Sequence, residues 1–178
     1  PMKRSKFSEE VRPPRREWAG AGVEIVLCDI MNEGHVERAL DGVDAVVHCA
    51  IGSSDVMVRG TENMLRASLR HGVRRFVHFS TVDVYGETEG NVDEETPLVR
   101  TGRTYGDSKI EAEELCRSYQ DRGLPMVILR PSIVYGPYAK LWVSKFAERI
   151  ASGSWGVYAK TGEGNCNLVY IQDVVDAV

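Results

Sequence analysis

The chain has 178 residues, of which 43% are hydrophobic and 27% charged, as in a soluble globular domain. Its net charge of −4 argues against nucleic acid or an anionic membrane as the main partner, and its basic residues cluster only within positions 1–16. No apolar run reaches the roughly 20 residues that a membrane-spanning helix needs. Four scattered cysteines without a metal-type spacing predict reduced thiols and a cytosolic location.

Four compact runs rich in β-branched residues predict strands buried on both faces; they occupy positions 23–30, 44–50, 74–81 and 125–130. Helical periodicity occupies the segments between them, at 32–42, 56–72 and 105–122, and each of these ends at or just before a glycine. Alternating strands and helices predict an α/β fold, a doubly wound parallel sheet.

A dinucleotide-binding sheet opens with a strand, a glycine-rich turn and a helix that receives the pyrophosphate. The nearest candidate here is "GAGVE" at 20–24, which precedes a strand instead of following one. We interpret it as a turn and not as a phosphate loop.

Tyr105 and Lys109 stand four residues apart at the start of the helix predicted over 105–122. Residues at this spacing share one helix face, and a nearby ammonium lowers the pKa of a tyrosine. The pair is therefore a candidate for moving a proton onto or off a substrate oxygen.

The ends of neighbouring strands supply further candidates. The strand over 74–81 continues into "STVDVYGE", which places the Thr81 hydroxyl at the carboxyl end of a parallel strand, where ligands bind in open α/β sheets. The next strand ends in "RPSIVYGP", a turn at the same edge. These strand ends flank the Tyr105 helix.

The motifs "VVHCA", "VRGTENMLRA", "STVDVYG", "YGDSK", "LRPSIVYGP" and "LVYIQDVVDA" occur in this order from about position 23 to the end. In this order and spacing they resemble the extended short-chain dehydrogenase/reductase family, the NAD(P)-dependent epimerase/dehydratase group. The resemblance implies a Rossmann-type domain fragment over 1–178, incomplete at both ends, with 136–178 also starting the substrate-binding part. It also implies that a glycine-rich βαβ unit precedes the chain.

The resemblance implies that Tyr105 is the acid/base, that Lys109 tunes it and holds the nicotinamide ribose, and that Thr81 polarises the reacting oxygen. The cofactor, NAD or NADP, would also contact Asp29, Ile30, Cys49, Ala50, Ile51, Pro131, Ser132 and Val134. A homodimer is expected for the full-length protein.

Departures from the family pattern concern the substrate, a small molecule. Asp83 follows Val82 where dehydratases of the family carry an Asp-Glu pair, which argues against elimination of water. Ile133 stands where sugar-nucleotide epimerases often carry asparagine, so a steroid- or flavonoid-type ketone reductase competes with a nucleotide-sugar enzyme.

The same motifs also admit a function without catalysis. A non-catalytic dinucleotide-binding sensor or scaffold would use the same sheet, but it has no need of a tuned tyrosine. A metal site is not expected, because the four histidines fall on separate elements.

Overall fold

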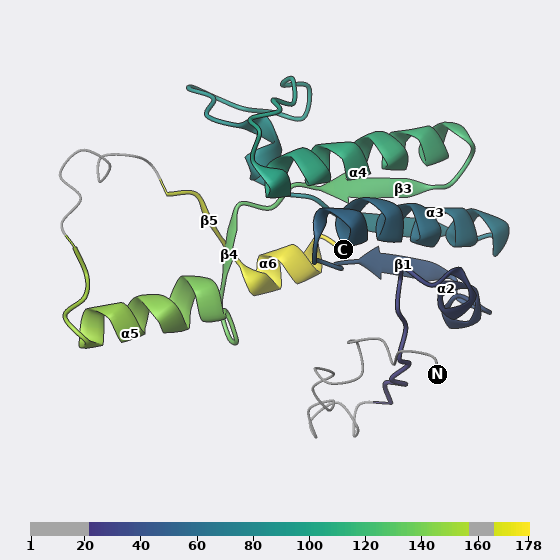
Figure 1. Cartoon of the computed structure of the whole chain (residues 1–178), viewed down its shortest axis with the longest axis horizontal. Helices are drawn as coiled ribbons and strands as arrows, with labels where there is room; N and C mark the ends of the chain where they lie inside the picture. Colours follow the sequence, from purple (N-terminus) through teal and green to yellow (C-terminus); the bar gives the residue numbers. More distant parts are fainter. Residues whose placement is uncertain (1–21, 157–165) are drawn as a thin grey trace, which may run out of the picture.

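The computed structural model describes residues 22–156 and 166–178, so the basic cluster at 1–16 lies outside the described residues. Its main sheet contains β1 (Ala45–His48), β2 (Arg75–Phe79) and β3 (Met126–Leu129), in the order β1-β2-β3. All neighbours are parallel (Figure 1). Three of the four predicted strands are thereby confirmed, and their carboxyl ends meet at one edge.

The predicted helices are also present. They are α2 (Glu33–Ala39), α3 (Thr61–Arg70), preceded by a π-helical turn η2 (Val56–Gly60), and α4 (Thr104–Asp121). Asn32 caps α2 by accepting a hydrogen bond from the His35 amide at 3.1 Å.

The glycines that follow these helices close them as predicted. Gly42, Gly72 and Gly123 have φ angles of 71°, 67° and 98°, in the left-handed region that favours glycine. In this region a side chain costs energy, so the three positions end the helices where the chain must turn back into the sheet.

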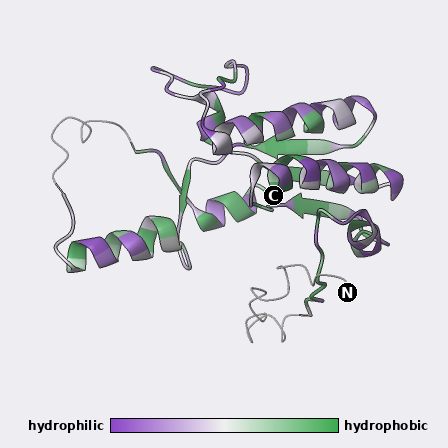
Figure 2. Ribbon diagram, viewed as in Figure 1, coloured by the Kyte–Doolittle hydropathy of each residue, from purple (hydrophilic) through white to green (hydrophobic). Residues whose placement is uncertain are grey.

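The main core lies between one face of the sheet and helices α2, α3 and α4, which lie along that face (Figure 1). Val46 and Phe76 share a register position and pack there against Leu65 and Cys116. The strands are largely hydrophobic (Figure 2). On the opposite face Val47 and Val127 are about half exposed, at 49% and 47%.

The prediction of a strand over 23–30 is wrong. These residues pair with no strand within the described part of the chain, and Val23, Ile25 and Leu27 are 56%, 49% and 70% exposed. A β-strand needs a neighbouring strand to form hydrogen bonds with its backbone. An apolar run without such a neighbour leaves its backbone N–H and C=O groups to bind water. Only its end, Cys28 and Ile30, packs against the core.

A second, two-stranded parallel sheet joins β4 (Ile133–Tyr135) to β5 (Leu168–Tyr170). The other elements are the 3₁₀ turn η3 (Val82–Tyr85), η4 (Lys140–Ser144), α5 (Lys145–Ala151) and α6 (Ile171–Asp176). Helix α5 projects from the body, whereas α6 lies beside the main sheet (Figure 1). Within residues 22–156 and 166–178 no helix is long and apolar enough to cross a bilayer.

Gly60 lets the start of α3 approach Ile30. A Cβ at position 60 would lie 2.5 Å from Ile30 Cδ1 and 2.8 Å from Cγ1, closer than real contacts allow. We expect Gly60→Ala to destabilise the protein by about 1–2 kcal/mol, because overpacking outweighs the better helix propensity of alanine. Urea denaturation measures this change.

The background variant Ile30→Ala is the control, because it removes both clashing carbons. In that background Gly60→Ala should be neutral or stabilising. An equal loss of stability in both backgrounds would contradict the steric explanation.

Candidate active site

The carboxyl edge of the main sheet is built by the segments that leave β1, β2 and β3. Backbone hydrogen bonds hold two of them together: Ser80 N donates to Leu129 O at 2.7 Å, and Val82 N donates to Pro131 O at 3.2 Å. The residues after β2 and β3 therefore stay side by side beyond the strands themselves.

Thr81 is buried at this edge and caps η3, because its hydroxyl accepts a hydrogen bond from Asp83 N at 3.2 Å. Tyr105 lies in the first turn of α4, close enough to the Thr81 side chain for Thr81 to influence the pKa of its phenol. The structure thus brings together the hydroxyl and the phenol that the sequence placed on separate elements.

Tyr105 is 37% exposed, and partial burial raises the pKa of its phenol above the ordinary value. The Thr81 side chain opposes this rise, and the nearby Asp83 carboxylate adds to it. The direction is opposite to the lowered pKa expected from the sequence. The raised pKa favours the protonated form of the Tyr105 phenol.

The position of Lys109 explains why the pKa of Tyr105 is not lowered as the sequence predicts. Its side chain is 5% exposed, and Nζ donates a hydrogen bond to the Phe79 carbonyl at 2.7 Å. Burial lowers the pKa of Lys109, whereas the nearby groups Cys49, Cys116 and Glu113 raise it. The ammonium is committed to the end of β2 and does not lower the pKa of Tyr105.

Asp29 and Ile30, which the sequence predicts to contact the cofactor, lie in the turn before α2. The Asp29 carboxylate accepts a hydrogen bond from Met31 N at 3.0 Å, and Asn63 Nδ2 donates to the Ile30 carbonyl at 2.9 Å. These contacts fix the turn against α3.

Cys49, Ala50 and Ile51 follow β1 at the same edge as Thr81. Apolar side chains stand exposed here, Ile51 at 69% and Val82 at 38%. A flat aromatic ring lying on this edge would bury them, so the residues present fit a nicotinamide dinucleotide.

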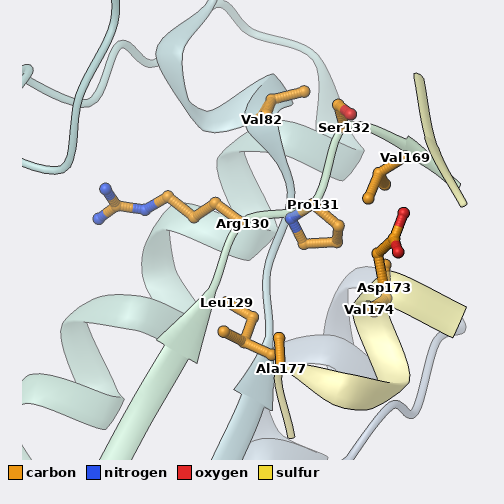
Figure 3. A pocket seen from close by; sticks show the side chains of 9 residues that line it. All are labelled: Val82, Leu129, Arg130, Pro131, Ser132, Val169, Asp173, Val174 and Ala177. Atoms are coloured by element: carbon orange, nitrogen blue, oxygen red, sulfur yellow. The ribbon is translucent and has the colours of Figure 1, made fainter. Parts of the chain in front are cut away.

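Pro131 and Ser132 line a cavity of about 350 Å³ between the ends of β2 and β3 and helix α6. Figure 3 shows Val82, Val169 and Asp173 around it, whereas the Arg130 side chain points away. Val134 and Ile133 lie next along the chain, half-buried in β4. The lining is mainly apolar.

A second hollow of about 1220 Å³ lies beside η3 and is lined by Asp83, Tyr85 and the loop 86–94. The two cavities share Val82, Leu129 and Arg130. Asp83 is exposed and lies near Tyr105, so it can meet a substrate there.

Sequence reasoning missed two contacts that fix the site. Ser54 and Ser108 share a 2.7 Å hydrogen bond, which ties the segment after β1 to α4. Arg130 forms a two-pronged ion pair with Glu113. Glu113 follows Lys109 by four residues, so its place on the same helix face was a signal present in the sequence.

Within the described residues no three His, Cys, Asp or Glu side chains gather as metal ligands. Cys28, Cys49, Cys116 and Cys166 are free thiols.

Proteins of similar sequence include a sugar epimerase and a steroid dehydrogenase. The chain is 28% identical over 163 residues to N-acetyl-alpha-D-glucosaminyl-diphospho-ditrans,octacis-undecaprenol 4-epimerase of Escherichia coli O157:H7, across 84% of the chain and 49% of that protein. It is 28% identical over 169 residues to 3beta-hydroxysteroid-dehydrogenase/decarboxylase isoform 1 of Arabidopsis thaliana, across 87% of the chain and 38% of that protein.

Among solved structures, dTDP-glucose 4,6-dehydratase DesIV of Streptomyces venezuelae, with NAD and TYD bound, superposes with a TM-score of 0.73. It shares 29% sequence identity, across 83% of the chain and 51% of that protein. The match confirms a Rossmann-like α/β fold, and the chain spans about half the length of DesIV and of the E. coli epimerase.

The model of one family, described as the NAD dependent epimerase/dehydratase family, matches residues 3–178, nearly the whole chain. The expected cofactor, NAD or NADP, is therefore NAD for this family. The chain belongs to the NAD dependent epimerase/dehydratase family.

Proposed function

We propose that the protein exchanges a hydride and a proton at a secondary alcohol or ketone carbon of a nucleotide sugar, as an oxidoreductase or epimerase. The observation that carries the proposal is that the Thr81 and Tyr105 side chains lie close together at the carboxyl edge of the sheet, with Lys109 buried beside them. Relatives named as epimerases and dehydratases of sugars linked to diphosphates support this substrate class.

When bound, NAD supplies the group that accepts or returns the hydride. The chain's own groups handle the proton. In the reducing direction Tyr105 Oη donates its proton to the substrate oxygen, while the Thr81 hydroxyl donates a hydrogen bond to the same atom. In the oxidising direction Tyr105 must first give up its proton, and the resulting phenolate then accepts the proton of the substrate hydroxyl.

The dinucleotide would be held along the edge by Asp29, Ile30, Cys49, Ala50, Ile51, Tyr105, Lys109, Pro131, Ser132 and Val134. Lys109 would contact the ribose while retaining its bond to the Phe79 carbonyl. We further propose a cytosolic homodimer, in keeping with the free thiols.

The test is conversion of nucleoside-diphosphate hexoses by the full-length protein with NAD, followed by chromatography of the products. We expect an epimer or a keto sugar from at least one hexose. Binding of NAD without conversion of any nucleotide sugar or hydroxysteroid would instead support a non-catalytic sensor.

A second candidate is a steroid-type alcohol dehydrogenase or ketone reductase. The mainly apolar lining of the 350 Å³ cavity favours it, with Leu129, Val169 and Val174 facing the space beside Pro131. The relative in Arabidopsis thaliana, named as a 3beta-hydroxysteroid dehydrogenase/decarboxylase, agrees with it. Conversion of hydroxysteroids but not of nucleotide sugars would select this candidate.

A further inference from the structure

Arg130 and Glu113 form a buried ion pair that no step of the proposed chemistry uses. Arg130 Nε donates to Glu113 Oε1 at 2.9 Å and Nη2 donates to Oε2 at 2.7 Å. Their side chains are 10% and 0% exposed. Burying two charges costs several kcal/mol per ion before their attraction is counted, so such a pair is weak evidence for stability and raises the question of another role.

The guanidinium reaches beyond Glu113. Nη1 donates to Tyr85 Oη at 2.6 Å and to the Glu94 carbonyl at 3.3 Å, and the Tyr85 ring lies 5.1 Å from the guanidinium carbon. Four of the five N–H groups of Arg130 are thereby engaged within the protein. Little donor capacity remains for a ligand, although Arg130 lines both cavities.

Two of the three partners of Arg130 belong to the elements that carry the candidate catalytic residues. Glu113 lies on α4, four residues after Lys109 and eight after Tyr105. Tyr85 ends η3, the turn that Thr81 caps. Arg130 itself directly follows β3, so one guanidinium joins the end of a strand, the catalytic helix and the threonine turn.

We propose that Arg130 is a positioning residue that, through Glu113 and Tyr85, sets the distance between the Thr81 hydroxyl and the Tyr105 phenol. The planar fork of arginine fixes both direction and distance, which a point charge does not. This inference rests on the proposed function, because the role of Arg130 is to align the two side chains that would both contact the reacting oxygen.

The principal test is Arg130→Lys in the full-length protein, which keeps the positive charge and loses the fork. We expect kcat to fall by about 10- to 100-fold, as a small misplacement of catalytic groups does, with little change in the KM for NAD. Tyr85→Phe removes one contact of the guanidinium and should give a smaller fall in kcat.

Arg117→Met is the matched control. Arg117 also contacts Glu113, at 3.6 Å, but its side chain is 56% exposed and, among the described residues, it forms no ion pair with another catalytic element. It should keep the kcat of the unsubstituted protein. Wild-type kcat in a folded Arg130→Lys protein, or an equal loss in Arg117→Met, would overturn the proposal.

Hydrogen–deuterium exchange supplies a readout that does not depend on activity. Arg130→Lys should speed exchange in both the Val82–Tyr85 turn and the first turns of α4, whereas Arg117→Met should not. If the unsubstituted protein converts no substrate, the proposed function fails, and this measurement still decides the coupling. Unchanged exchange in the two segments would then overturn it.

Discussion

Replacing Tyr105 by phenylalanine is expected to lower turnover by about 100- to 10,000-fold, the usual contribution of a positioned acid or base. The substitution removes only the phenolic oxygen, which lies near Thr81 and is the proposed proton donor for the reacting oxygen. The affinity for NAD should change little, because the ring remains in place. Steady-state kinetics of the full-length protein on its substrate measures the loss.

Tyr119→Phe is the matched control for this substitution. Tyr119 lies on the same helix, is 5% exposed and packs in the main core, far along α4 from the sheet edge. Its loss of a hydroxyl should leave turnover unchanged. Turnover within a few-fold of the wild type in Tyr105→Phe would contradict the assignment of Tyr105 as the acid/base.

The helices and most of the sheet could be predicted from the sequence because local signals decided them. The Asn32 side chain caps a helix by accepting a hydrogen bond from a free backbone amide. Gly42 and Gly123 end helices because glycine readily adopts the left-handed backbone conformation found there. The approach of Tyr105 to Thr81 followed from a rule of the same kind, since parallel strands bring their carboxyl ends to one edge.

Features that depend on contacts between distant parts of the chain could not be predicted from the sequence. The apolar run 23–30 has the composition of a strand, but pairing is decided by a neighbouring strand and not by the run itself. The spacing of Tyr105 and Lys109 places both on one helix face, yet the Phe79 carbonyl determines where the ammonium points. Arg130 and Glu113 meet across 17 positions of sequence, which no local pattern indicates.

The surroundings of His48 and His78 also depend on contacts between distant parts of the chain, and they affect the stability of the fold. The sequence placed both on buried strands, and the parallel register stacks their rings 5.6 Å apart on the helix-covered face. Thr61 gives its hydroxyl proton to the Met57 carbonyl at 2.6 Å, so it accepts a hydrogen from His48 Nε2 at 2.9 Å. Neither ring nitrogen of His78 has a partner within the described residues.

Burial lowers the pKa of His48 from 6.5 to about 4, helped by the charge of Lys109. Burial, His48 and Lys109 together lower the pKa of His78 to about 3. Both rings therefore stay neutral in the folded protein at pH values where the unfolded chain binds protons. Their lowered pKa values cost no stability above pH 6.5 and an increasing amount as the pH falls from 6.5 toward 4.

We expect the free energy of unfolding to drop by about 4 kcal/mol between pH 7.5 and pH 5 on account of these two histidines, at about 1.4 kcal/mol per pKa unit for each. His78→Leu keeps the volume and removes one titrating ring, so it should lose about 2 kcal/mol less over this interval. Urea denaturation at the two pH values measures both. Ser68→Ala is the control, because Ser68 is equally buried and unpartnered within the described chain but does not titrate. Its effect on stability should be the same at both pH values, and an undiminished acid loss in His78→Leu would show that His78 accepts a proton in the folded state.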